Sequence, residues 1–124
     1  MMDMRNRELL LQIITRLEAT SEDEWCTAIV SNGDTRCCLG HVFDMGATVQ
    51  EANQWWNWFE DFVATTYMIY PVNDGEHPGY QQATPKARVL AYLHGILDGR
   101  EKTSWEAMED NAKFSLSGGQ ADEH

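Results

Sequence analysis

The residues between Thr48 and Pro71 constrain the fold most, because they have the pattern of one long and mainly apolar helix. Thr48 and Glu51 have the spacing of a capping box, in which two side chains bond reciprocally to free backbone N–H groups at a helix start. Proline interrupts the hydrogen bonds of a helix, so Pro71 is expected to end this one. We therefore predict the longest helix of the protein over residues 52–69, followed by a loop over residues 72–83.

The apolar side chains of this predicted helix cover two adjoining stripes, which is wider than packing against one neighbour requires. The first stripe consists of Ala52, Trp56, Phe59, Val63 and Tyr67, and the second of Trp55, Trp58, Phe62 and Ile69. The helix is therefore either central in the protein or faces a partner. We expect Trp56 and Phe59 to lie in the core and Trp58 to be at least partly exposed.

Four other segments carry helix signals. Apolar residues recur on one helical face near the N-terminus, and again in a segment that Thr84 caps and Pro85 begins. A second capping box, formed by Thr103 and Glu106, opens a last short helix. Gly46 is expected to stop the helix before it in a left-handed conformation. We predict these four helices at residues 7–18, 39–45, 85–99 and 103–113.

Residues 25–31 and 34–38 have the composition of two β-strands. The dipeptide Asn32-Gly33 between them is the commonest two-residue hairpin turn, because both positions accept a positive φ. We therefore predict one small hairpin. In an alternative interpretation, Ser21 and Glu24 form a capping box and this region begins with a short helix.

The composition fits one folded unit. Of the 124 residues 43% are hydrophobic, which is enough for one packed core, and no interior linker or repeat divides the chain. We therefore predict a mainly α protein with one small β-hairpin (α+β). It is expected to form a single compact domain over residues 1–114, with a disordered tail over residues 115–124.

The charge balance restricts the possible partners. With 20 acidic and 9 basic residues the net charge is -11, so the surface repels phosphate backbones and anionic lipids. We expect no direct nucleic-acid binding and no membrane binding, because no apolar run has the length that spans a membrane, and we expect no signal peptide. Three cysteines fit a reducing compartment better than a disulfide framework. We therefore expect a cytoplasmic protein.

Basic residues are missing from the middle of the chain. Neither Lys nor Arg occurs between Cys37 and Pro85, but six carboxylates do, namely Asp44, Glu51, Glu60, Asp61, Asp74 and Glu76. This region is either a solvated surface or a docking surface for a basic partner protein. Docking is plausible chemically, because aromatic side chains supply most of the energy of an interface and charge steers the encounter. The partner is expected to be a host protein with a basic surface, or a second copy of the chain. The residues that we predict to bind it are Trp55, Trp58, Glu60, Asp61 and Phe62.

Cysteine and histidine side chains offer a second kind of site, because they bind zinc and act as nucleophiles. The spacing favours neither role, since adjacent residues of a strand such as Cys37 and Cys38 point to opposite faces. We expect structural cysteines, with neither a metal nor a cofactor bound and no enzymatic activity. The alternative is a small-ligand or metal-binding domain. Its site would consist of Cys26, Cys38, His41, Asn73, Asp74 and His77. The simplest interpretation of the loop around Asn73 is an Asx-turn.

Several short motifs resemble a known family. They are Trp25-Cys26, then Arg36-Cys37-Cys38-Leu39-Gly40-His41, then Asn73-Asp74, and last Thr84-Pro85 ahead of Val89 and Leu90. In this order they resemble a set of small actinobacterial and actinophage proteins whose domain is catalogued as one of unknown function. The resemblance covers roughly residues 9–97 and implies a phage or actinobacterial origin. It makes a phage-encoded inhibitor or modulator of a host protein the leading expectation.

Overall fold

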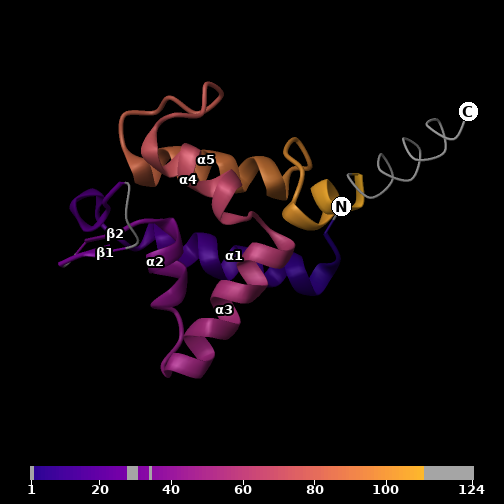
Figure 1. Ribbon diagram of the computed structural model, residues 1–124, viewed down its shortest axis with the longest axis horizontal. Helices are drawn as coiled ribbons and strands as arrows, with labels where there is room; N and C mark the ends of the chain where they lie inside the picture. The colour runs from indigo at the N-terminus through magenta and orange to yellow at the C-terminus, as the bar shows by residue number, and fades with distance from the viewer. Residues whose placement is uncertain (1, 28–30, 34, 111–124) are drawn as a thin grey trace, which may run out of the picture.

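The computed structural model describes residues 2–27, 31–33 and 35–110 (Figure 1). The elements are α1 (Met4–Glu18), the 3-10 helix η1 (Glu22–Glu24), β1 (Ser31–Asn32), β2 (Thr35–Arg36), α2 (Cys38–Phe43), α3 (Val49–Phe62), α4 (Thr66–Asp74) and α5 (Pro85–Leu97). A further helical segment covers residues 104–110. The predicted mainly α class is confirmed. The domain end predicted at residue 114 and the tail after it lie outside the described residues.

The helices pack around one hydrophobic core. α5 packs against α4 and against α1, and α2 contacts both α1 and α4. α3 packs mainly against α2, and its N-terminal end extends away from the other helices (Figure 1). The largest fully buried apolar side chains come from all five helices and the α3–α4 junction. They are Leu10, Ile13, Leu17, Leu39, Val42, Phe59, Val63, Ile69, Val72, Val89 and Leu93.

Three helix starts are confirmed, because each depends on a local cap. The hydroxyl of Thr48 accepts the N–H of Glu51 at 3.1 Å, and Thr84 caps α5 in the same way, with Pro85 in the first turn. Thr103 and Glu106 bond to each other's backbone N–H groups at 3.0 and 3.1 Å, which is a complete capping box. The end of this last helix lies outside the described residues.

The single helix predicted over residues 52–69 is wrong, because the chain breaks it after Phe62 into α3 and α4. Val63 is the C-cap of α3, and the Ala64 N–H reaches back to the Phe59 carbonyl at 3.0 Å. Thr65 then takes an extended conformation as the N-cap of α4. The Thr65 side chain makes no cap hydrogen bond, so capping does not account for the break, although a β-branched threonine is weak in a helix interior.

Pro71 lies inside α4, so the loop predicted from residue 72 is also wrong. The helix continues to Asp74 and ends at Gly75, which has a left-handed φ of 82°. The N–H of Glu76 bonds to the Pro71 carbonyl at 2.8 Å and completes the turn that ends α4. A proline deprives a helix of one hydrogen bond, which α4 tolerates because it is packed against α5.

The strands predicted over residues 25–31 and 34–38 are wrong in extent. β1 and β2 pair antiparallel over two residues each, which is too short to form a sheet, and part of each predicted strand lies outside the described residues. Cys38 is the first residue of α2 and no longer extended. The alternative interpretation is confirmed, since Ser21 and Glu24 form the capping box of η1 with a backbone bond of 2.9 Å.

Gly46 does not end α2 in a left-handed conformation, which corrects that prediction. Among the described glycines only Gly33, Gly75 and Gly99 have a positive φ. A Cβ at Gly46 would lie 2.1 Å from the backbone nitrogen of Ala52, where no side chain fits. Glycine is therefore needed here because the α2–α3 connection passes close to the first turn of α3.

Arg88 fixes the C-terminal end of α4 and is only 9% exposed. Its Nε donates to the Val72 carbonyl at 3.1 Å and its Nη2 to the Asn73 carbonyl at 2.8 Å. Its Nη1 donates to the Gln82 carbonyl at 2.9 Å. The last carbonyls of a helix lack partners within the helix, and a cation is favourable beside them. Arg88 therefore holds α4 and the following loop against α5.

Candidate functional site

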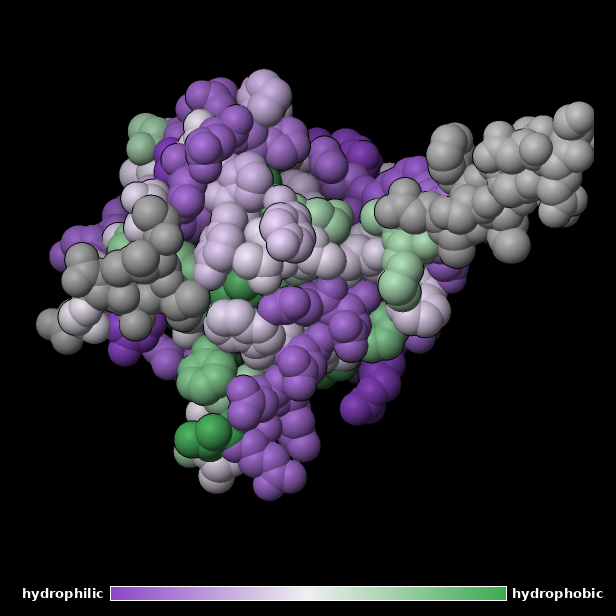
Figure 2. Space-filling view, in the orientation of Figure 1, coloured by the Kyte–Doolittle hydropathy of each residue, from purple (hydrophilic) through white to green (hydrophobic). Residues whose placement is uncertain are grey.

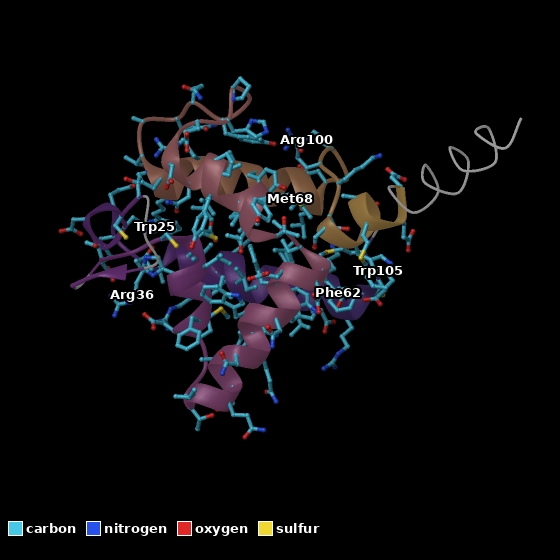
Figure 3. All side chains as sticks on the ribbon, in the orientation of Figure 1. Trp25, Arg36, Phe62, Met68, Arg100 and Trp105 are labelled. Carbon is cyan, nitrogen blue, oxygen red and sulfur yellow. The ribbon has the colours of Figure 1, made fainter. Side chains whose placement is uncertain are left out.

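Four aromatic side chains form a continuous row along α3 and the helical segment 104–110, and we call them the aromatic row. Ring centroids are 6.3 Å apart for Trp55 and Trp58, 6.3 Å for Trp58 and Phe62, and 5.6 Å for Phe62 and Trp105. The first pair is edge-to-face and the last is stacked, which are arrangements that aromatic rings prefer. Figure 3 shows Phe62 and Trp105 close together where α3 ends.

The aromatic row is fixed at its base and open at the surface. Its three α3 members are half-buried, and Trp105 is 44% exposed. The Trp58 indole N–H donates to the Asn6 side-chain oxygen at 2.9 Å, which holds the ring against α1. One groove beside Trp55 and Trp58 is also lined by Arg5, Leu9, Glu51 and Gln54. A second groove beside Phe62 and Trp105 is also lined by Met2, Asp3, Asn6, Thr103 and Glu106.

Carboxylates outnumber cations beside the aromatic row. Glu51, Asp3 and Glu106 line its two grooves, and Arg5 is the basic residue among the described lining residues. The backbone N–H of Thr103 bonds to Glu106 and lowers the pKa of that carboxyl below its usual value. The row therefore lies in a mainly negative environment.

The structure brings together three of the five residues predicted to bind a partner. Trp55, Trp58 and Phe62 are members of the aromatic row, whereas the exposed Asp61 and the half-buried Glu60 line a separate hollow beside the helical segment 104–110. Glu60 also bonds within α3 and to α4. It accepts the indole N–H of Trp56 and, at 3.3 Å, the Thr66 hydroxyl. Glu60 therefore takes part in the junction of α3 and α4 and lies away from the row.

The environment of Trp56 differs from the sequence prediction, whereas those of Phe59 and Trp58 agree with it. Phe59 is fully buried as predicted, but Trp56 is only half-buried and packs edge-to-face on Phe43 of α2 at 6.0 Å. Trp58 is partly exposed as predicted, although its bond to α1 gives it a structural role as well. Trp105 was missed as a member of the surface, because only the tertiary fold brings its helix next to α3. Its position near the capping Thr103 indicated a helix start but did not indicate a contact with α3.

The residues of the alternative ligand site meet in part, around the fully buried Asn73. The Asn73 oxygen accepts the N–H of Cys38, at the start of α2, at 3.0 Å. Its amide nitrogen donates to the Cys26 carbonyl at 2.9 Å and to the Asp74 carboxylate at 3.0 Å. Asn73 is therefore a helical residue that joins three segments, and the predicted Asx-turn is wrong.

The two histidines of that alternative lie apart and have separate partners. His41 is buried against Trp25, with ring centroids 4.6 Å apart, and its Nε2 donates to the Glu24 carbonyl at 3.1 Å. Burial lowers the pKa of His41, so the neutral ring is favoured. The His77 ring accepts the N–H of Gly79 at 2.9 Å and packs against Tyr80.

The thiols and carboxylates do not form a metal centre in the part of the chain that the structure describes. No three His, Cys, Asp or Glu side chains are grouped closely enough there to coordinate an ion. Burial raises the pKa of Cys38 well above its usual value, which disfavours the reactive thiolate. The contacts of Asn73 and His41 are those of structural residues.

None of the helices within the described residues has the length and apolar character needed to span a membrane.

Comparisons with known proteins identify no relative of this chain. No protein family matches the sequence, and no similar protein was found among the curated proteins or among the solved structures.

Proposed function

We propose that the protein acts by binding another protein, through the aromatic row and the carboxylates beside it. The observation that carries this proposal is the row itself, in which four aromatic rings in mutual contact remain partly accessible. Tryptophan is the residue type most enriched among the energetic anchors of interfaces. A row fixed by a hydrogen bond to α1 loses little side-chain entropy on binding.

The charge supports a basic partner. The chain carries a net charge of -11, and the charged residues among those lining the two grooves are three carboxylates and one arginine. Such a surface attracts a positively charged segment and raises the association rate, and this attraction weakens with added salt. An amphipathic segment with apolar side chains along one face and Lys or Arg at its edges fits both features.

The resemblance to actinobacterial and actinophage proteins adds a biological setting to the proposal. A phage-encoded protein of this size would act in the host cytoplasm as an inhibitor or modulator of a host protein. It would do so by occupying a surface, since the described residues provide aromatic anchors and negative charge and no group of metal ligands. A second copy of the chain is the other occupant that the row could accept.

Affinity capture with matched variants tests the proposal. The wild-type protein, Trp105→Ala and Tyr67→Ala are immobilised and exposed to an actinobacterial lysate at low and high salt, and retained proteins are quantified by mass spectrometry. Tyr67 is the matched control, because it is a 92% exposed aromatic residue of α4 outside the row. We expect a basic protein on the wild type and on Tyr67→Ala, with loss on Trp105→Ala and at high salt.

Two results would contradict the proposal. One is that all three baits retain the same proteins in the same amounts, so that the row makes no difference. The other is that no protein is retained above the level of an inert bait. Equilibrium sedimentation of the free protein separates the homodimer from the heteromeric case, because a dimer through the row dissociates in Trp105→Ala and persists in Tyr67→Ala.

A further inference from the structure

A hollow with a volume of about 430 Å³ lies where the end of α3, the start of α4 and the helical segment 104–110 meet. We call it the acidic hollow, because Glu60 and Asp61 line it and none of its described lining residues is basic. A cluster of carboxylates alone is usually a solvated surface. The other lining residues therefore decide whether the hollow can hold a ligand.

A buried hydroxyl without a partner lies in the same hollow. Ser104 lines the hollow and is only 6% exposed, and its Oγ has no hydrogen-bond partner in the described part of the chain. The other described lining residues are half-buried or exposed, so Ser104 forms the floor. Its N–H donates to the Val63 carbonyl at 2.9 Å, which fixes it at the end of α3. Because buried hydroxyls are nearly always hydrogen-bonded, this one indicates a ligand that supplies the missing partner.

Further oxygen acceptors around the hollow are unused. Thr65 lines it as the N-cap of α4, and its side chain makes no cap hydrogen bond. Asp61 forms no hydrogen bond or ion pair with another described residue. Glu60 accepts the Trp56 indole N–H and the Thr66 hydroxyl through the same oxygen, Oε1, which leaves Oε2 for a ligand. The acidic hollow therefore offers several acceptors to a ligand with several donors.

The remaining wall of the hollow is apolar. It consists of Met68 of α4 and of Ala107 and Met108 of the helical segment 104–110. A primary ammonium group has three N–H donors and no acceptor, and methionine side chains adapt readily to an alkyl chain. A metal ion fits less well, because Ca²⁺ takes about six to eight oxygen ligands and no three acidic, His or Cys side chains of the described residues are grouped for one.

We propose that the acidic hollow is a binding site for a primary alkylammonium group. The ammonium donates to Asp61, to Oε2 of Glu60 and to the hydroxyl of Ser104, and the alkyl chain lies against Met68 and Met108. The net charge of -11 raises the concentration of such cations near the surface. A lysine side chain of a protein and a free alkyl diamine both carry this group. The site does not depend on the partner proposed above, since a small molecule is sufficient to occupy it.

Titration of the full chain with n-butylammonium chloride, followed by two-dimensional ¹H–¹⁵N NMR spectra, tests the site. Butan-1-ol is the control ligand, because it has the same alkyl chain without the charge. We expect saturable shifts that are largest for the residues lining the hollow, and no saturable response to butan-1-ol. Two further probes, 1,4-diaminobutane and Nα-acetyl-lysine N-methylamide, distinguish the sources. The tighter of the two identifies the natural ligand as a free diamine or as a lysine residue, and either result supports the site.

Matched variants complete the test. Asp61→Asn and Ser104→Ala each remove one acceptor, so each should raise the Kd for n-butylammonium by at least about threefold. Asp98→Asn is the control, because it removes the same charge from an exposed residue at the end of α5, outside the hollow. It should bind as the wild type does. Ser104→Ala should keep its melting temperature, since the hydroxyl that it loses has no partner.

Four results would each overturn the proposal. Butan-1-ol produces the same shifts as n-butylammonium, or none of the three ammonium probes binds saturably. Asp98→Asn weakens binding as much as Asp61→Asn does, which would reflect the general charge of the surface. A folded Ser104→Ala binds with the Kd of the wild type. Calcium chloride produces the same shifts at a lower concentration than n-butylammonium, which would indicate a metal site.

Discussion

Replacing Asn73 with alanine should destabilise the protein more than any substitution of a surface amide. The side chain is fully buried and bonds to the Cys38 N–H and the Cys26 carbonyl. Truncation leaves these two groups without their partner, and an unsatisfied buried polar group costs about 1 to 3 kcal/mol. Because the Cys26 residue is only half-buried, we expect a total loss of about 2 to 4 kcal/mol in the free energy of unfolding.

Urea unfolding followed by circular dichroism measures this loss. With a denaturant slope of about 2 kcal/mol per molar, the midpoint should fall by about 1 to 2 M at an unchanged slope. The matched control is Gln81→Ala, since Gln81 is an exposed amide that bonds to two backbone carbonyls in the same region, those of Gly75 and His77. A midpoint for Asn73→Ala that equals that of Gln81→Ala would refute the assignment of Asn73 as the residue that joins α2, α4 and the Cys26 segment.

Three further predictions follow from the same contacts. Arg88→Met keeps the volume but removes the donors to three carbonyls, so it should lower the unfolding free energy by about 2 to 4 kcal/mol in the same urea assay, and a loss below that of Gln81→Ala would contradict it. Burial lowers the pKa of His41 in the folded state below 6.5, so the unfolded chain binds more protons there. The stability that His41 contributes is present above about pH 6.5 and lost as the pH falls below it, and His41→Gln should flatten the decrease in stability from about pH 7 to 5. Protein purified without added zinc should contain well under one equivalent of the metal and keep its melting temperature in a chelator, whereas stoichiometric zinc with unfolding by the chelator would contradict the structural role of the cysteines.

The sequence predicted those features of the fold that depend on neighbouring residues. Thr48, Thr84 and Thr103 mark helix starts because a cap bonds only three residues ahead. The break after Phe62 was missed, since apolar periodicity continues through it and only packing decides that Thr65 begins a new helix. The helix end predicted at Pro71 is wrong for a similar reason. The rule that proline ends a helix considers only neighbouring residues, and it omits the packing of α4 against α5.

The candidate site was predictable only where one helix contains it. Trp55, Trp58 and Phe62 share a stripe of α3, so their spacing was sufficient to group them. Trp105 joins them through a tertiary contact 43 residues after Phe62 in the sequence, and no local signal announces that contact. Figure 2 shows hydrophilic residues along the visible face of α3, with hydrophobic residues at its N-terminal end. Asn73 likewise carried a turn signal in sequence, while its partners lie 35 and 47 residues away.

The affinity of a captured partner for matched variants tests the central claim most directly. The partner, once purified, is titrated against the wild type, Trp105→Ala and Tyr67→Ala by isothermal calorimetry, after circular dichroism has shown that all three are folded. Removing a tryptophan anchor weakens an interface by about 2 kcal/mol or more, so Trp105→Ala should raise Kd by at least about tenfold. Tyr67→Ala should bind within about twofold of the wild type. A folded Trp105→Ala that binds as tightly as the wild type would contradict the aromatic row as the binding surface.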